Sequence, residues 1–145
     1  MKQLITATCL FLTALFCSAS FSQEINHQPI VNKDPEKLVI LWTSGDKEVA
    51  MNAVLMYGKN SFDFGLWTDM EIIIWGPSAK LAATDSEVQT QIKKMIKSGI
   101  KFKACQVCAD NYGVAKDLTK LGVNVIWMSQ VLTQHIARGN YILTF

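Results

Sequence analysis

The stretch Leu38-Val39-Ile40-Leu41-Trp42 is a short, continuous apolar run, and it predicts a β-strand buried on both faces. Two runs of the same kind follow it, Ile72-Ile73-Ile74-Trp75 and Val123-Asn124-Val125-Ile126-Trp127-Met128. Weaker patterns predict two more strands, over residues 101–105 and 141–145. Strands of this kind are typical of parallel sheets, because helices cover both faces of such sheets.

Helical patterns separate the predicted strands. The spacing of apolar residues predicts helices over about residues 46–57, 84–98, 107–121 and 129–138. Thr84 and Glu87 match a capping box at the start of the second helix, and Gly113 is expected to divide the third. Right-handed crossovers between parallel strands place helices on both sides of a sheet. The predicted fold class is therefore α/β, with three α/β/α layers around a five-stranded parallel sheet.

Residues 1–22 have the features of a secretory signal peptide. Lys2 gives a positive start, an apolar stretch follows, and small residues at Ser20 and Ser22 fit the positions before a cleavage site. The apolar stretch is short for a membrane anchor. Lipidation at Cys17 is disfavoured because a bulky phenylalanine precedes it. We therefore expect this segment to be removed on export.

The rest of the chain has the length of one domain. We expect a signal peptide at residues 1–22, a flexible leader at 23–36 and a single domain at 37–145, with no membrane span after cleavage. Export predicts a periplasmic location, where disulfides can form. The full chain has 14 Lys and Arg against 12 Asp and Glu, and this balance argues against a nucleic-acid partner.

Cys105 and Cys108 stand where a predicted strand meets a predicted helix, and they are the only cysteines outside the predicted signal peptide. A helix N-terminus favours thiolate over thiol. A Cys-x-x-Cys pair also spans one helical turn, which suits disulfide exchange or the resolution of a persulfide. The alternative is a structural role, as two small apolar side chains or as a static disulfide.

The carboxyl ends of parallel strands are where ligands collect. The candidates for a ligand pocket are therefore residues that follow predicted strands: Ser44, Gly45, Gly76, Pro77 and Ser129. No metal site is predicted, because one Cys-x-x-Cys supplies two of the four ligands of a structural zinc. His135 is expected to be semi-buried and hydrogen-bonded. No cofactor is expected, because the chain has neither a dinucleotide fingerprint nor a P-loop.

Four features resemble the DsrE/DsrF family of small α/β proteins, which includes YchN-like members: the strand order, the Trp75-Gly76-Pro77 turn, the segment Ala-Cys-Gln-Val-Cys-Ala-Asp-Asn-Tyr-Gly-Val at 104–114, and the closing Gly-Asn-Tyr-Ile-Leu-Thr-Phe. The resemblance spans about residues 37–145. It implies a five-stranded parallel sheet and assembly as a homotrimer or homohexamer. It also implies Cys105 as the position through which sulfur-trafficking members pass persulfide sulfur, with Cys108 as a second cysteine.

Two functions follow as hypotheses. The first is a periplasmic thiol protein in which Cys105, with Cys108, accepts or relays persulfide sulfur or exchanges disulfides. Its partner would be a sulfur donor or acceptor protein, or a small thiol or sulfur compound. The second is a non-catalytic oligomeric module that binds a small ligand and keeps its cysteines for structure. Fast reaction of Cys105 with alkylating reagents near neutral pH is expected only of the first.

Overall fold

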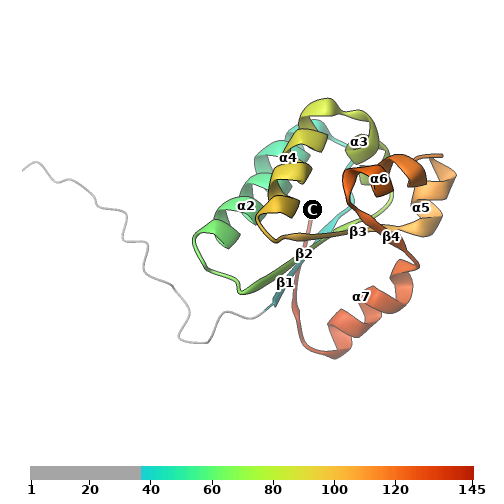
Figure 1. Ribbon diagram of the computed structural model, residues 1–145. Helices are drawn as coiled ribbons and strands as arrows, with labels where there is room; N and C mark the ends of the chain where they lie inside the picture. The colour runs from blue at the N-terminus through green and yellow to red at the C-terminus, as the bar shows by residue number, and fades with distance from the viewer. Residues whose placement is uncertain (1–36) are drawn as a thin grey trace, which may run out of the picture.

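The computed structural model describes residues 37–145, which form a five-stranded parallel sheet between helices (Figure 1). The strands are β1 (Lys37–Trp42), β2 (Asp69–Ile74), β3 (Lys101–Cys105), β4 (Asn124–Ile126) and β5 (Tyr141–Thr144). Their order across the sheet is β4-β3-β2-β1-β5, and all neighbours are parallel. The predicted fold class is confirmed. The signal peptide and leader predicted for residues 1–36 lie outside the described residues.

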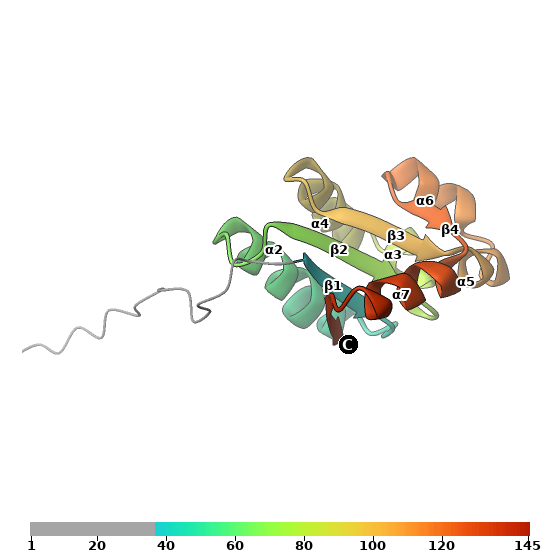
Figure 2. The same cartoon turned by 90° about the horizontal axis from the view of Figure 1, so that it is seen from below.

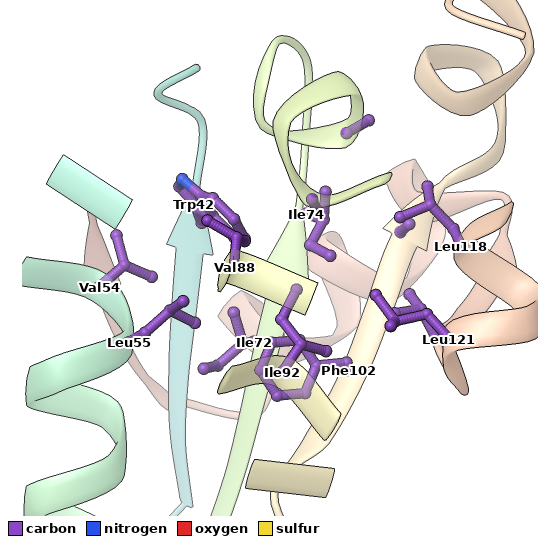
Figure 3. Close-up of a cluster of buried hydrophobic side chains, with 14 of the residues drawn as sticks. Trp42, Val54, Leu55, Ile72, Ile74, Val88, Ile92, Phe102, Leu118 and Leu121 are labelled. Carbon is purple, nitrogen blue, oxygen red and sulfur yellow. The ribbon is translucent and has the colours of Figure 1, made fainter. Parts of the chain in front are cut away.

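Most helices lie on one face of the sheet. The connections from β1 to β4 all step in the same direction across the sheet, so right-handed crossovers place them on one side. They contain α1 (Lys47–Val49), the π-helix η1 (Ala50–Leu55), α2 (Met56–Asp63), α3 (Ser78–Thr84), α4 (Ser86–Lys97), α5 (Gln106–Asn111) and α6 (Ala115–Leu121). Figure 3 shows Ile72 and Ile74 of β2 in one buried cluster with residues of α4 and α6.

One described helix, α7 (Met128–Ala137), covers the opposite face of the sheet. The connection from β4 to β5 joins the two edges of the sheet and therefore runs back across it. It contains α7, the only helix on this face among residues 37–145 (Figure 2). Met128 of α7 forms a small buried cluster with Val39, Ile73 and Cys105 of the sheet. The two outer layers are thus unequal, and the second consists of one helix.

Local signals explain where the helices begin and end. The side chain of Asp85 accepts hydrogen bonds from the backbone N–H groups of Glu87 and Val88, so Asp85 caps α4. The predicted capping box at Thr84 is therefore wrong, because Thr84 is the last residue of α3. Gly122 ends α6 with a φ of 95°, as predicted. No described helix combines the length and the apolar character needed to cross a membrane.

Candidate functional site: a cysteine pair and a buried charge cluster

Cys105 and Cys108 lie at the carboxyl edge of the sheet, as the sequence predicts. Cys105 is the last residue of β3 and the N-cap of α5, and it pairs with Ile126 of β4. Its side chain is 6% exposed, whereas Cys108, in the first turn of α5, is partly exposed. Both cysteines are free thiols. The strand end therefore brings the two thiols together, with Cys108 as the more accessible one.

The surroundings of the pair favour the neutral thiol at Cys108. Burial raises the pKa of Cys108, and its contact with the Cys105 thiol raises it further, although the backbone N–H of Gly76 opposes the rise. The expectation that the helix N-terminus favours thiolate is therefore wrong for Cys108. α5 has only six residues, and its dipole does not outweigh the loss of water around the sulfur.

Two of the five predicted pocket residues line a surface cavity. Gly45 and Pro77 line a surface cavity of about 340 Å³ together with Lys80, Leu81, Thr84 and Tyr112. Gly76 instead turns its backbone N–H to Cys108. Ser44 and Ser129 do not line this cavity. The cavity walls include no cysteine, so this cavity and the thiol pair are separate features of the carboxyl edge.

Ser78 is a buried polar residue that positions the carboxyl edge. Its hydroxyl donates to the carbonyl of Trp42 at 2.7 Å and accepts from the N–H of Trp75 at 3.0 Å. The N–H of Trp75 also donates to the Trp42 carbonyl at 2.9 Å. These bonds tie the end of β1 to the end of β2. They thereby fix the turn that places the backbone N–H of Gly76 beside Cys108.

A second polar group, the Glu71 cluster, lies between the sheet and α7. It consists of Glu71 and the side chains that contact it or its partners: Lys37, Asp69, Lys101, Lys103, His135 and Asn140. Glu71 in the central strand β2 is 1% exposed. Its carboxylate contacts Nζ of Lys37 at 3.1 Å and Nζ of Lys103 at 3.0 Å. Buried charge of this kind is stable only when it is paired.

His135 joins this cluster from α7. Its Nε2 lies 3.0 Å from Oε1 of Glu71, and its Nδ1 lies 2.9 Å from Nδ2 of Asn140. Because the Asn140 amide nitrogen is a donor, Nδ1 accepts and Nε2 carries the proton donated to Glu71. The predicted hydrogen bonding of His135 is confirmed, but the side chain is buried rather than semi-buried, at 5% exposure.

The charges around Glu71 decide its protonation. Burial raises the pKa of Glu71, but hydrogen bonds from Lys103, Lys37 and His135 outweigh burial and hold this pKa below its ordinary value. The pKa of Asp69 is lowered in the same way, because Lys101 and Lys37 outweigh burial.

Sequence reasoning missed this cluster. The available signal was the alternation of charged residues at 69 and 71, and at 101 and 103, which places each pair on one face of its strand.

The cysteine pair and the Glu71 cluster can support few kinds of chemistry. Within residues 37–145 no three His, Cys, Asp or Glu side chains are grouped so that they could hold a metal ion. The Glu71 cluster consists of groups that already bind one another, which is typical of a structural role. The cysteine pair offers two free, adjacent nucleophiles at a sheet edge where ligands collect.

Known structures share this fold. A conserved protein of unknown function, BT1422 from Bacteroides thetaiotaomicron, is 45% identical, with a TM-score of 0.73 over 75% of this chain and 94% of that one. The protein of unknown function MTH1491 from Methanobacterium thermoautotrophicum is 17% identical, with a TM-score of 0.64 over 77% and 100% of the two chains. The ychN protein of E. coli is 14% identical, with a TM-score of 0.56 over 78% and 100%.

Sequence comparison leads to a family. No curated protein matches this chain. The model of the DsrE/DsrF-like family matches residues 38–145, which include all five strands except Lys37, the cysteine pair and the rest of the Glu71 cluster. The chain therefore belongs to the DsrE/DsrF-like family.

Proposed function

We propose that this protein is an exported thiol protein that accepts or relays sulfur, or exchanges disulfides, through Cys105 together with Cys108. The observation that carries this proposal is the contact between two free thiols at the carboxyl edge of a DsrE-like sheet. The family is generally linked to sulfur relay, and the chemistry needs a cysteine nucleophile with access to a partner. The partner is a persulfide-bearing protein or a small thiol or sulfur compound.

The transfer step needs no outside oxidant. The Cys105 thiolate attacks the outer sulfur of a donor persulfide, R–S–S–H, and a new S–S bond forms on Cys105. The donor S–S bond breaks, and its electron pair leaves with R–S⁻, which takes up the proton that Cys105 lost. An acceptor thiolate then removes the outer sulfur by the same exchange. Alternatively, Cys108 attacks the inner sulfur, which releases HS⁻ and leaves a Cys105–Cys108 disulfide.

The two cysteines have different roles in this scheme. Cys105 ends the strand and carries the sulfur, as the resemblance to sulfur-trafficking members implies. Cys108 lies within contact of it and is poised to resolve the adduct. Its raised pKa keeps much of Cys108 protonated near neutral pH, which slows resolution and prolongs the life of the persulfide.

The test is mass spectrometry of the reduced protein after incubation with a polysulfide donor. Wild-type protein should gain sulfur in steps of one atom, Cys105→Ser should gain none, and Cys108→Ser should accumulate the adduct. Ser44→Ala is a matched control at the same edge of the sheet, and it should load as wild type does. Loading of Cys105→Ser but not of Cys108→Ser would reverse the assignment of roles, equal loading of the two variants would contradict it, and no loading of wild type would reject sulfur transfer.

The second candidate function is a binding module with structural cysteines. The surface cavity beside Gly45 and Pro77 favours it, as does the burial of Cys105. In that case Cys105 should alkylate no faster than an ordinary exposed thiol at neutral pH. Because burial also slows alkylation of Cys105 in a sulfur-transfer protein, the gain of sulfur from the polysulfide donor separates the two functions.

The proposal includes export to the periplasm. It is based on the composition of residues 1–22, and an oxidising compartment permits the Cys105–Cys108 disulfide. Intact-mass analysis of protein from an envelope fraction should show a mature N-terminus at Gln23 and, without reductant, at most two alkylatable cysteines. Recovery of the uncleaved chain from the cytosol would argue for a cytoplasmic sulfur relay instead.

A further inference from the structure

Helix α7 is buried at only two positions, one near each end. They are Met128 in its first turn and His135 near its last turn. Met128 is 1% exposed and belongs to the same buried cluster as Cys105. His135 is bonded to Glu71 and Asn140. The same helix therefore covers the cysteine at one end and is anchored by the Glu71 cluster at the other.

Because Cys105 is buried, a partner can reach its thiol only when the element that covers it moves. At 6% exposure its thiol is closed to a partner protein, although it lies at the edge where partners bind. The helices of the other face pack on the large core and cannot move without disturbing it. α5 also reaches the small cluster that contains Cys105, through Cys108, but α5 packs on the large core through Ala109. Among the described helices α7 alone lies on the other face of the sheet, and it contributes Met128 to the small cluster (Figure 2). Exposure of Cys105 therefore depends on α7.

We propose that the contact between Glu71 and His135 is a latch that holds α7 over Cys105, and that release of this latch exposes the thiol to its partner. Glu71 and His135 are thus positioning residues of the cysteine site. This inference rests on the proposed function only in taking Cys105 as a thiol that reacts with an external partner.

The latch can open without unfolding the sheet. When His135 leaves, the carboxylate of Glu71 keeps Lys37 at 3.1 Å and Lys103 at 3.0 Å, so no buried charge is left unpaired. The large core lies on the opposite face and is untouched. Motion of α7 is therefore a local opening of the kind that proteins make far more often than global unfolding.

The test compares alkylation of Cys105 by iodoacetamide in a Cys108→Ser background. His135→Leu replaces the imidazole that donates to Glu71 with an apolar side chain of similar size. It should accelerate alkylation about tenfold, as expected when one hydrogen bond to a charged group is lost from an opening equilibrium. His135→Gln keeps a donor near the place of Nε2 and should restore a rate close to that of the parent. Gln134→Leu, an exposed neighbour on α7, is the matched control and should not change the rate.

Hydrogen exchange separates a local opening from global unfolding. In His135→Leu the amides of α7 should exchange faster, while those of β1 and β2 keep their protection. Equal acceleration in α7 and in the sheet, or an unchanged alkylation rate, would overturn the latch. Asn140→Ala provides a second variant should His135→Leu fail to fold, and it should raise the rate about threefold through the lost bond to Nδ1.

The outcomes distinguish the latch from sulfur transfer. Alkylation needs no sulfur donor, so a latch-dependent rate in a protein that never gains sulfur would support the latch and reject the proposed function. Sulfur loading together with an alkylation rate that is the same in His135→Leu as in its parent would support the proposed function and reject the latch.

Discussion

Oε1 of Glu71 lies 3.0 Å from Nε2 of His135, and both side chains are buried between the central strand and α7. Two lysines contact the same carboxylate. Glu71→Ala should therefore lower the free energy of unfolding by about 3 kcal/mol, because it leaves the partly buried ammonium group of Lys103 without a carboxylate partner and Lys37 with Asp69 alone. Urea denaturation measures this change. Lys101→Ala, which breaks an exposed pair with Asp69, is the control and should cost less than about 1 kcal/mol; an equal loss in both variants would contradict the prediction.

The lowered pKa of Glu71 makes stability depend on pH on the acid side. A carboxylate whose pKa is lower in the folded state than in the unfolded state stabilises the fold above its unfolded pKa, and this stabilisation is lost as the pH falls through the folded pKa. Asp69 contributes in the same direction. In Glu71→Gln the stability should fall less steeply on acidification below about pH 4.3, the ordinary pKa of a glutamate. Denaturation at several pH values checks this, and parallel curves for the two proteins would count against it.

The raised pKa of Cys108 has a direct kinetic consequence. The pH midpoint of its alkylation should lie above that of free cysteine, because burial and the Cys105 thiol both disfavour its thiolate. Replacing the neighbour, in Cys105→Ala, should move the midpoint of Cys108 downward. Since the two thiols are coupled, the wild-type profile belongs to the pair and the variant profile to Cys108 alone. An unchanged midpoint would show that the two thiols do not influence one another.

Gly45 is required by a close approach between two turns. A Cβ atom at this position would lie 2.9 Å from Cβ of Pro77. Gly45→Ala should therefore push the turns after β1 and β2 apart and lower the free energy of unfolding by about 1–2 kcal/mol, the range of a forced overpacking. Ser44→Ala, one residue earlier, should change stability by less than about 0.5 kcal/mol. Equal stability of Gly45→Ala and wild type would mean that the turns separate without strain.

Oligomeric assembly is the last prediction. β4 and β5 are the two edges of the sheet, and Trp127, Ile136 and Tyr141 expose much of their surface, at 68%, 63% and 45%. Open edges and exposed large apolar side chains are commonly covered by association. Light scattering of residues 23–145 should therefore give three or six times the mass of one chain. A monomer at micromolar concentration would exclude the homotrimer and homohexamer.

Local patterns in the sequence predict the elements well where one face or stripe is apolar. The strand predicted at residues 101–105 has the bounds of β3, and Gly113 separates α5 from α6 as expected. β2 begins at Asp69 instead of Ile72, because charged residues interrupt the apolar run at its start. α3 was missed because its Ala-rich segment has no clear apolar stripe, although it buries four of its seven residues.

The sequence by itself determined the parallel sheet, the position of the cysteine pair at a strand end and the membership of the family, because these depend on periodicity and on motifs that are local in the chain. Only the tertiary structure decided which groups surround them. Glu71 and His135 are 64 residues apart and meet because β2 is central and α7 crosses back over it. The pKa of Cys108 likewise depends on packing, because burial raises it and the backbone N–H of Gly76, at the end of another strand, opposes the rise. Burial and electrostatic pairing between distant segments are properties of packing, and no local pattern encodes them.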